Sequence, residues 1–156
     1  MTPRHLFASW LLALLSFSAA AGDWSLKDVA GNTHTLSGER GKWVLVNFWA
    51  PWCPPCIQEI PDLVALQDRH EAEVIGVAIM YKSRSEVTDM AGRLAINYPV
   101  VLGDEDTAGD FGGISALPTS ILYTSTGQLV GKHEGPLTRG EIEQALEGKA
   151  SALFTH

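Results

Sequence analysis

Two cysteines, Cys53 and Cys56, are the residues whose type and spacing point most directly to chemistry. They form a Cys-x-x-Cys motif in a chain that has no other cysteine. On a helix, residues three apart lie on the same face one turn from each other, so the two sulfurs are close enough to form a disulfide. The pattern predicts thiol-disulfide exchange, in which Cys53 attacks a substrate disulfide and Cys56 resolves the mixed disulfide.

The motif lies where an expected strand meets an expected helix. Residues 42–50 form a nearly continuous apolar and aromatic run, which is typical of a strand buried on both faces. Residues 57–70 place apolar side chains at near-helical spacing, with Pro61 as an expected kink. If Cys53 caps this helix, the free amide hydrogens of the first turn and the helix dipole stabilise its thiolate.

The two residues between the cysteines affect that thiolate. Pro54 and Pro55 have no backbone N–H, so within the motif only the amide of Cys56 can point at the Cys53 sulfur. We expect a thiolate that is less stabilised than in an oxidase with a polar residue before the second cysteine. Because a less stabilised thiolate favours the disulfide form, the motif predicts a reductant rather than an oxidant.

The remaining elements follow from hydrophobic spacing, turn residues and capping patterns. They are a hairpin within residues 24–36, a buried strand at 73–80, a helix from Ser83 to about Asn97, a short strand at 98–102, a short helix at 105–111, two strands at 119–123 and 128–133, and a helix from Thr138 to about Glu147. This order predicts an α/β fold with a mixed central sheet flanked by helices.

The N-terminus has the three-part pattern of a secretory signal peptide. Arg4 precedes an apolar run at residues 6–17, and small residues follow at 18–21. We therefore expect a signal peptide at residues 1–21 and one domain at residues 22–156, with both cysteines outside the cytoplasm, where disulfides persist. An uncleaved N-terminal membrane anchor is the alternative, although the apolar run is short for a membrane span.

Composition excludes several classes of protein. The 156 residues carry a formal charge of −7, and 46% of them are hydrophobic. That length fits one domain that can fold without disulfides or metals, and the hydrophobic content argues against a disordered chain. The acidic balance lacks the basic surface that binding to nucleic acid requires, so we expect no nucleic acid partner.

The two cysteines could also serve a structural role. A structural zinc site needs four ligands, but the histidines available to join the cysteines, His34, His70 and His133, are scattered along the chain. A purely structural disulfide that closes so short a loop would add little stability. We therefore expect no metal and no cofactor other than the redox-active disulfide itself.

The sequence around the motif, WAPWCPPC, resembles the active site of the thioredoxin superfamily. The wider pattern is most similar to the TlpA/ResA-like branch of secreted thiol-disulfide oxidoreductases. The segments that carry the resemblance are GKWVLVNFWAPWCPPC (41–56), CIQEIP (56–61), ALPTSILYTSTGQLV (116–130) and EGPLTRGEIEQAL (134–146). The resemblance implies a thioredoxin-like fold with an N-terminal β-hairpin and a central insertion at about residues 98–112.

The resemblance also implies roles for individual residues. Cys53 becomes the exposed nucleophile, Cys56 its buried partner, and Pro118 the cis proline that faces the disulfide. Its neighbours Leu117 and Thr119 would form the loop against which an extended substrate segment pairs its backbone. Only about 5–6% of X-Pro bonds in folded proteins are cis, so the cis bond is an implication of the resemblance alone.

Three more side chains are singled out near the motif. Trp52, beside Cys53, is the tryptophan that we expect to be exposed for substrate docking. Asn47 occupies the position of a buried Asp in cytoplasmic thioredoxins and cannot titrate. Glu59, three residues after Cys56, matches a carboxylate of the TlpA/ResA-like branch; if partly buried, it would have a raised pKa and could exchange the Cys56 proton. The alternative is an ordinary solvated Glu.

The expected function is that of an extracytoplasmic thiol-disulfide oxidoreductase, reducing rather than oxidising. Its substrates would be disulfides in exported proteins, for example in cytochrome c maturation or copper-site assembly, and a membrane thiol reductase would regenerate it. We expect a monomer. A disulfide-forming oxidase, a copper-binding chaperone that uses the dithiol as a soft ligand, and a peroxidase are the alternatives.

Overall fold

The computed structural model describes residues 22–149 and 151–155, so the signal peptide expected at residues 1–21 lies outside the described part. The centre of the domain is a five-stranded sheet with the order β5-β4-β3-β6-β7. The strands are β3 (Val44–Trp49), β4 (Glu73–Ala78), β5 (Val100–Leu102), β6 (Thr119–Tyr123) and β7 (Leu129–Glu134). β4 runs parallel to β3 and β5, whereas β6 is antiparallel to β3 and β7. The sheet is mixed, as the sequence predicts.

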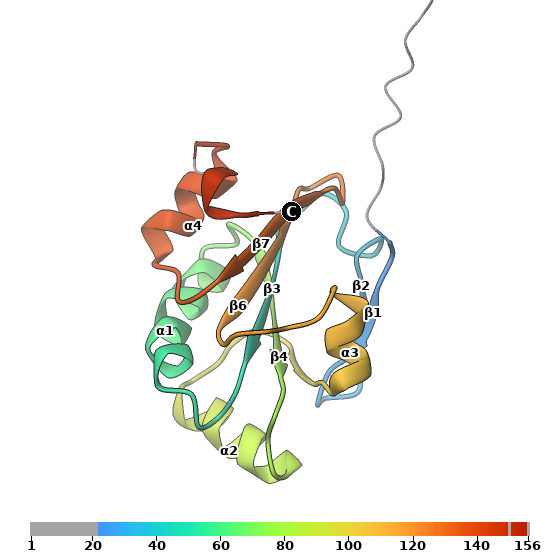
Figure 1. Cartoon of the computed structure of the whole chain (residues 1–156), viewed down its shortest axis with the longest axis vertical. Helices are drawn as coiled ribbons and strands as arrows, with labels where there is room; N and C mark the ends of the chain where they lie inside the picture. Colours follow the sequence, from blue (N-terminus) through green and yellow to red (C-terminus); the bar gives the residue numbers. More distant parts are fainter. Residues whose placement is uncertain (1–21, 150, 156) are drawn as a thin grey trace, which may run out of the picture.

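Two layers cover this sheet (Figure 1). The helices and the hairpin strands are α1 (Pro54–Asp68), α2 (Arg84–Arg93), α3 (Glu105–Asp110), α4 (Arg139–Leu146), β1 (Ser25–Lys27) and β2 (Thr33–Thr35). α1 and α4 lie on one side of the sheet, and the β1-β2 hairpin and α3 lie on the other (Figure 1). α2 joins the α1 side, because its Val87 is buried with Ile60 of α1 and Ala78 of β4.

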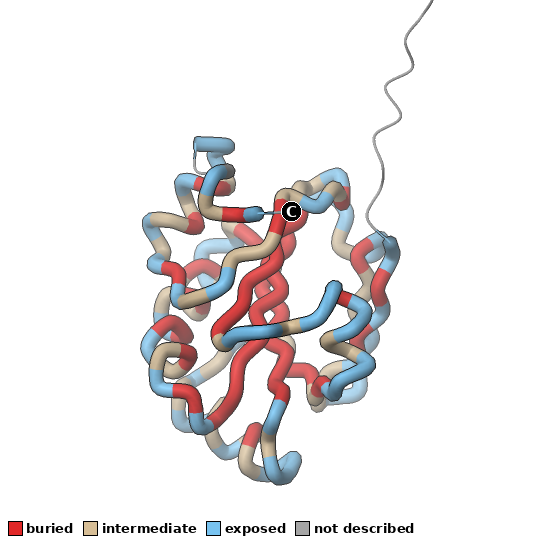
Figure 2. The backbone as a smooth tube through the Cα atoms, viewed as in Figure 1, coloured by how far each residue is buried: buried red, intermediate tan, exposed pale blue. Residues whose placement is uncertain are grey.

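Strand β3 positions the cysteine motif. All six of its residues are buried, and the strand lies between β4 and β6 (Figure 2). Its sequence VLVNFW is apolar at every position except Asn47, as expected of a strand with both faces covered. Because β3 ends at Trp49 and α1 begins at Pro54, the cysteine motif lies at the carboxyl end of the central strand.

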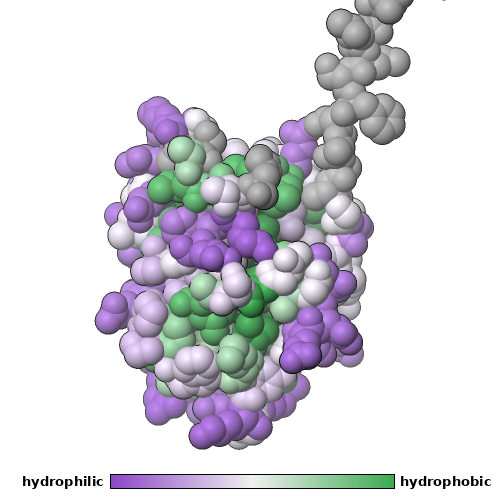
Figure 3. Space-filling model, viewed as in Figure 1, coloured by the Kyte–Doolittle hydropathy of each residue, from purple (hydrophilic) through white to green (hydrophobic). Residues whose placement is uncertain are grey.

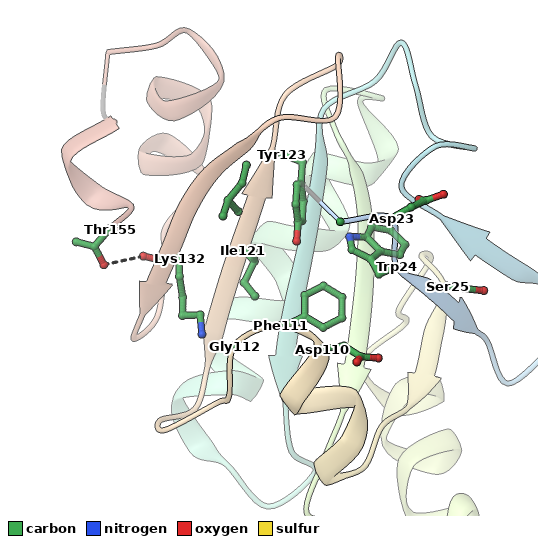
Figure 4. A pocket seen from close by; sticks show the side chains of 12 residues that line it. Asp23, Trp24, Ser25, Asp110, Phe111, Gly112, Ile121, Tyr123, Lys132 and Thr155 are labelled. Atoms are coloured by element: carbon green, nitrogen blue, oxygen red, sulfur yellow. Dashed lines mark hydrogen bonds between the residues drawn. The ribbon is translucent and has the colours of Figure 1, made fainter. Parts of the chain in front are cut away.

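The hairpin side of the sheet has its own aromatic packing. The Trp24 ring lies 5.9 Å from that of Phe111 and 6.1 Å from that of Tyr123, measured between centroids. These three side chains line a groove of about 710 Å³ over β6, with Lys132 and Thr155 among its other lining residues (Figure 4). The groove includes no residue of the cysteine motif, and Trp24 has a packing role there.

α1 begins at Pro54 with Cys53 as its N-cap, the arrangement considered from the sequence, because prolines fit the first turn, where an N–H has no intrahelical partner. Apolar spacing alone had located only residues 57–70 of this helix, and Pro61 lies inside it. One helix boundary differs from the prediction. α2 ends at Arg93 rather than near Asn97, because Ala95 takes a left-handed conformation with φ of 51°. Within the described ranges, no helix has the length and apolar character needed to cross a bilayer.

Candidate active site

Cys53 and Cys56 form a disulfide at the start of α1, with their Cα atoms 5.3 Å apart. Cys53 is the N-cap of the helix, and its backbone is extended with φ of −95° and ψ of 104°. Its sulfur accepts a hydrogen bond from the backbone amide of Cys56 at 3.4 Å. The first-turn geometry expected from the sequence is therefore present, with the Cys53 sulfur beside the positive end of the helix dipole.

The two cysteines differ in their access to substrate. Cys53 lines a groove of about 370 Å³, and Cys56 is not part of its wall. The exposure of Cys53 is nevertheless only 4%, against 1% for Cys56. Cys53 is thus less exposed than the resemblance implies, because its sulfur is bonded to that of Cys56 in the disulfide. Of the two cysteines, Cys53 is therefore the one that borders the groove.

Uncharged side chains line this groove throughout. They are Trp52, Cys53, Pro54, Pro55, Ile79, Met80, Ile114, Ser115, Ala116 and Leu117. Trp52 is 52% exposed, as predicted, and its indole N–H donates to the carbonyl of Met80 at 2.7 Å. Met80 is 67% exposed with φ of 55°. Apolar surface is visible beside the segment that joins α3 to β6, which forms one wall of the groove (Figure 3).

The Leu117-Pro118 peptide bond is cis, in agreement with the implication of the sequence resemblance. Leu117 lines the groove together with Cys53, and the carbonyl of Pro118 accepts a hydrogen bond from the amide of Gly135 at 2.8 Å. This bond ties the proline loop to the segment after β7. Of the loop residues expected to meet substrate, Leu117 is therefore the one with a side chain in the groove.

Thr119 begins the predicted strand, but it lies inside the sheet rather than in a loop that is open to substrate. It is the first residue of β6, fully buried, and paired in register with Phe48 on one side and Glu134 on the other. Its hydroxyl donates to the carbonyl of Ala116 at 2.8 Å. Because its flanks are covered by neighbouring strands, Thr119 orders the proline loop and has no free edge for substrate pairing.

Glu59 is a buried carboxyl group on the helix face shared with Cys56. Only 3% of the residue is exposed. Its Oε2 accepts a hydrogen bond from Asn47 Nδ2 at 3.1 Å, and its Oε1 accepts one from the backbone amide of Leu137 at 2.9 Å. Burial raises the pKa of Glu59 to about 7, since it outweighs these two donors, and the nearby Asp62 raises the pKa further. The solvated Glu alternative is therefore wrong.

Asn47 connects Glu59 to the neighbouring strand. Asn47 is only 1% exposed, and its Nδ2 also donates a hydrogen bond to Ser120 Oγ at 3.1 Å. From the sequence, Asn47 was expected only to be a group that cannot titrate, and these contacts were not predicted. The contact of Leu137 was also missed, because a backbone amide leaves no signal in a side-chain pattern. A polar residue inside an otherwise apolar strand was the one available indication of a buried partner.

No metal centre accompanies the disulfide in the part of the chain that the structure describes. No group of three or more His, Cys, Asp or Glu side chains is placed there to hold a metal ion. The chemistry available to the described site is that of a disulfide at a helix N-terminus, a buried carboxyl group and an uncharged groove.

Comparison with known proteins agrees with this geometry. The model of the redoxin family matches residues 16–147. The chain belongs to the redoxin family. This redoxin is 32% identical over 136 residues to the thiol-disulfide oxidoreductase ResA of Bacillus subtilis (strain 168), covering 85% of this chain and 75% of that protein.

Two solved structures have a similar fold. A thiol:disulfide interchange protein of the thioredoxin family from Chlorobium tepidum TLS matches with a TM-score of 0.74 and 28% identity, over 85% of the redoxin and 97% of that chain. The exposed lipoprotein thioredoxin Etrx1 of Streptococcus pneumoniae strain TIGR4 matches with a TM-score of 0.70 and 26% identity, over 81% and 99%. The redoxin is a ResA-like thiol-disulfide oxidoreductase of the thioredoxin superfamily, with Cys53 and Cys56 as its redox-active pair.

Proposed function

We propose that this redoxin reduces disulfides in exported proteins, outside the cytoplasm. The direction of electron flow is inferred from the surroundings of Cys53 Sγ. Within the motif, the amide of Cys56 is the one backbone group that donates a hydrogen bond to this sulfur. Pro54 and Pro55 cannot donate. Because the Cys53 thiolate gains only this one motif amide, the disulfide form is favoured and electrons pass from the protein to its substrate.

The proposed reaction balances as two thiol-disulfide exchanges. In the first, the Cys53 thiolate attacks a sulfur of the substrate disulfide, the substrate S–S bond breaks, and one substrate thiolate leaves. In the second, the Cys56 thiolate attacks Cys53 Sγ and releases the other substrate thiolate. The substrate gains two electrons and two protons, and the protein is left in the disulfide form seen in the structure.

Glu59 has a part in the second step of this proposal. Cys56 must lose its proton to become a nucleophile, and Cys56 is buried, with 1% exposure. Glu59 lies three residues later on α1, and its pKa of about 7 leaves a carboxylate available to accept a proton near neutral pH. We assign Glu59 as the proton acceptor for Cys56 when the substrate is released, and as the donor when the protein is reduced again.

The groove beside Cys53 is the proposed substrate site. Trp52 and Leu117 both line it, and the cis peptide bond joins Leu117 to Pro118. Since no charged side chain lines the groove, it suits a segment with apolar residues next to its cysteine. Disulfides of exported proteins such as an apocytochrome c or a copper-site assembly protein are the proposed substrates, and a membrane thiol reductase is the proposed electron donor.

The location rests on two observations. The N-terminal pattern of residues 1–21 supports a signal peptide, and its removal would leave the domain at residues 22–156. The relative from Streptococcus pneumoniae is described as an exposed lipoprotein. Expressing the full chain in a bacterium and measuring the mass of the protein in the periplasmic fraction tests this part, and a cytoplasmic protein that retains residues 1–21 would contradict it.

Trapping experiments test the assigned roles. Cys56→Ala leaves mixed disulfides unresolved, so this variant should accumulate disulfide-linked partners at Cys53, and Cys53→Ala should accumulate none. If the Cys53→Ala variant instead captured partners through Cys56, the roles would be reversed. The reduction potential tests the direction: a value nearer about −270 mV supports a reductant, whereas one nearer about −120 mV would indicate a disulfide-forming oxidase.

A further inference from the structure

The interior beside Glu59 contains two polar groups that the proposed mechanism does not use. They are the hydroxyl of Tyr98 and the indole N–H of Trp49, both buried and without a hydrogen-bond partner among the described residues. A buried polar group without a partner costs free energy of about 1–3 kcal/mol. Most such groups in proteins are satisfied by protein or ordered water, so this pair requires an explanation.

The side chains of Tyr98 and Trp49 both lie close to Gly76 of β4. A Cβ atom at Gly76 would lie 2.9 Å from Cε2 of Tyr98 and 3.3 Å from Nε1 of Trp49. Cε2 adjoins the carbon that bears the Tyr98 hydroxyl, so the hydroxyl end of the ring lies near this glycine. The amide of Gly76 also donates to the carbonyl of Pro99, which fixes the segment that carries Tyr98. The missing side chain of Gly76 is thus what allows the two groups to approach each other.

This place is next to Glu59. Gly76 is the register partner of Asn47, and partners on neighbouring strands present their side chains on the same face. Trp49, two residues after Asn47 on β3, presents its side chain on that face as well. Asn47 donates to the Glu59 carboxylate. The charge of Glu59 also raises the pKa of Tyr98, in addition to the larger effect of burial, which places the phenol within electrostatic reach of the carboxylate.

We propose that Tyr98 and Trp49 hold a buried water molecule beside Gly76 and that this water donates a hydrogen bond to the Glu59 carboxylate. The two protein groups are donors, and one water oxygen accepts two hydrogen bonds, so a single molecule satisfies both. Its own hydrogens then remain for Glu59. Buried waters in proteins make about three hydrogen bonds each, which is the number this site supplies.

Tyr98 is then a positioning residue for the proton exchanger. The water gives the Glu59 carboxylate a third donor besides Asn47 and Leu137, and each donor to a carboxylate favours its charged form. The other titratable groups around Glu59 are Asp62 on its own helix and Cys56 in the motif, with His133 on β7 as the register partner of Ser120. None of these is altered by a change at Tyr98.

The test is Tyr98→Phe, which removes one oxygen atom. The pKa of Glu59 is measured in the oxidised protein from the pH dependence of its ¹³C-labelled carboxyl resonance, which Glu59→Gln identifies. Loss of the donor should raise that pKa by about half a unit to one unit. Tyr123→Phe is the matched control, because Tyr123 is a buried tyrosine on the hairpin face of the sheet. It should leave the Glu59 pKa unchanged.

Two results would overturn the proposal. The first is an unchanged or lowered Glu59 pKa in Tyr98→Phe. The second needs no variant: the wild-type protein must show a magnetisation transfer between the Trp49 indole proton and a long-lived water, and its absence refutes the site. The inference takes its functional meaning from the proposed role of Glu59. Because both measurements use oxidised protein without substrate, their failure is distinguishable from failure of the Cys56→Ala trapping.

Discussion

The backbone amide of Cys56 donates a hydrogen bond to the sulfur of Cys53 across 3.4 Å, and no other amide between the two cysteines can do so. The helix dipole and this one amide stabilise the Cys53 thiolate. We therefore expect the reduced protein to show a Cys53 pKa above about 4, outside the range of the strong oxidant DsbA. Titration of the thiolate absorbance in the ultraviolet measures it, and a lower value would contradict the direction of electron flow proposed here.

Replacing the second proline tests the same contact. Pro55→Ala restores an N–H at the second helical residue, a position from which an amide reaches the N-cap side chain. The added donor should lower the Cys53 pKa by about half a unit to one unit, and should make the disulfide easier to reduce. Pro54→Ala is the comparison, because the amide of the first helical residue does not point at the N-cap side chain, and it should have the smaller effect.

Glu59 makes the stability of the protein depend on pH. Its folded pKa of about 7 lies above the ordinary value of 4.5, so the folded protein binds the extra proton between these values. The stabilisation from the protonated form is complete below about pH 4.5 and is lost as the pH rises towards 7. The free energy of unfolding should therefore fall by about 3 kcal/mol over this range from Glu59 alone.

Denaturant unfolding of the oxidised protein at pH 5 and pH 8 measures this effect against Glu59→Gln. Glutamine cannot titrate, so the variant should lack this part of the pH dependence, whatever its stability at a single pH. Between pH 5 and pH 8, the free energy of unfolding of the wild-type protein should fall by about 2–3 kcal/mol more than that of Glu59→Gln. Equal pH dependence in both proteins would mean that Glu59 titrates normally.

Trp52 should contribute to the binding of protein substrates. It is half-exposed at the rim of the Cys53 groove, where aromatic side chains often dominate binding free energy. Trp52→Ala should lower kcat/KM for a protein disulfide by about tenfold, with a smaller loss for a low-molecular-weight disulfide. Leu129→Ala is the control, because Leu129 is 42% exposed and lies on β7 at the other groove. A similar loss in both variants would argue against a docking role for Trp52.

Gly76 should resist replacement. In Gly76→Ala, the new Cβ would meet the Tyr98 ring at 2.9 Å, so the ring or the strand must shift, at a cost of about 1–3 kcal/mol. Gly140 in α4 is the opposite case, since a Cβ there meets nothing within 4 Å. Gly140→Ala should stabilise the protein slightly, because alanine favours a helix more than glycine does. Thermal unfolding measures both changes, and equal effects of one sign would contradict this account.

Sequence patterns were sufficient for the parts of this molecule that depend on local rules. The continuous apolar run predicts β3, the Cys-x-x-Cys spacing predicts the disulfide, and the proline pair predicts that Cys56 supplies the amide to Cys53. The Thr138 capping pattern predicts the start of α4, where both reciprocal hydrogen bonds are present. Each of these features is determined by residues that are close in the chain.

The parts that were wrong or missed depend on contacts between distant segments. Thr119 follows Pro118 in sequence, but strands β3 and β7 cover it from both sides. Ser83 caps α2 as expected. The Glu86 carboxylate, however, accepts a hydrogen bond from the amide of Lys82 and not from that of Ser83, so the capping box is incomplete. The partner of Glu59 at Leu137 lies 78 residues away. No local spacing contains this information, because it arises only when the sheet is assembled.

The pair formed by Asn47 and Ser120 has a consequence for how the interior can adapt when Glu59 gains or loses a proton. An amide offers a donor on one side and an acceptor on the other, and a hydroxyl can serve as either. The nitrogen of Asn47 lies 3.1 Å from Glu59 Oε2, an orientation that suits a charged carboxylate. When Glu59 is neutral, a half-turn of the same amide presents the oxygen, and the Ser120 hydroxyl can then donate to it. Two side-chain rotations thus match the hydrogen bonds to either charge state, while β3 and β6 stay in place.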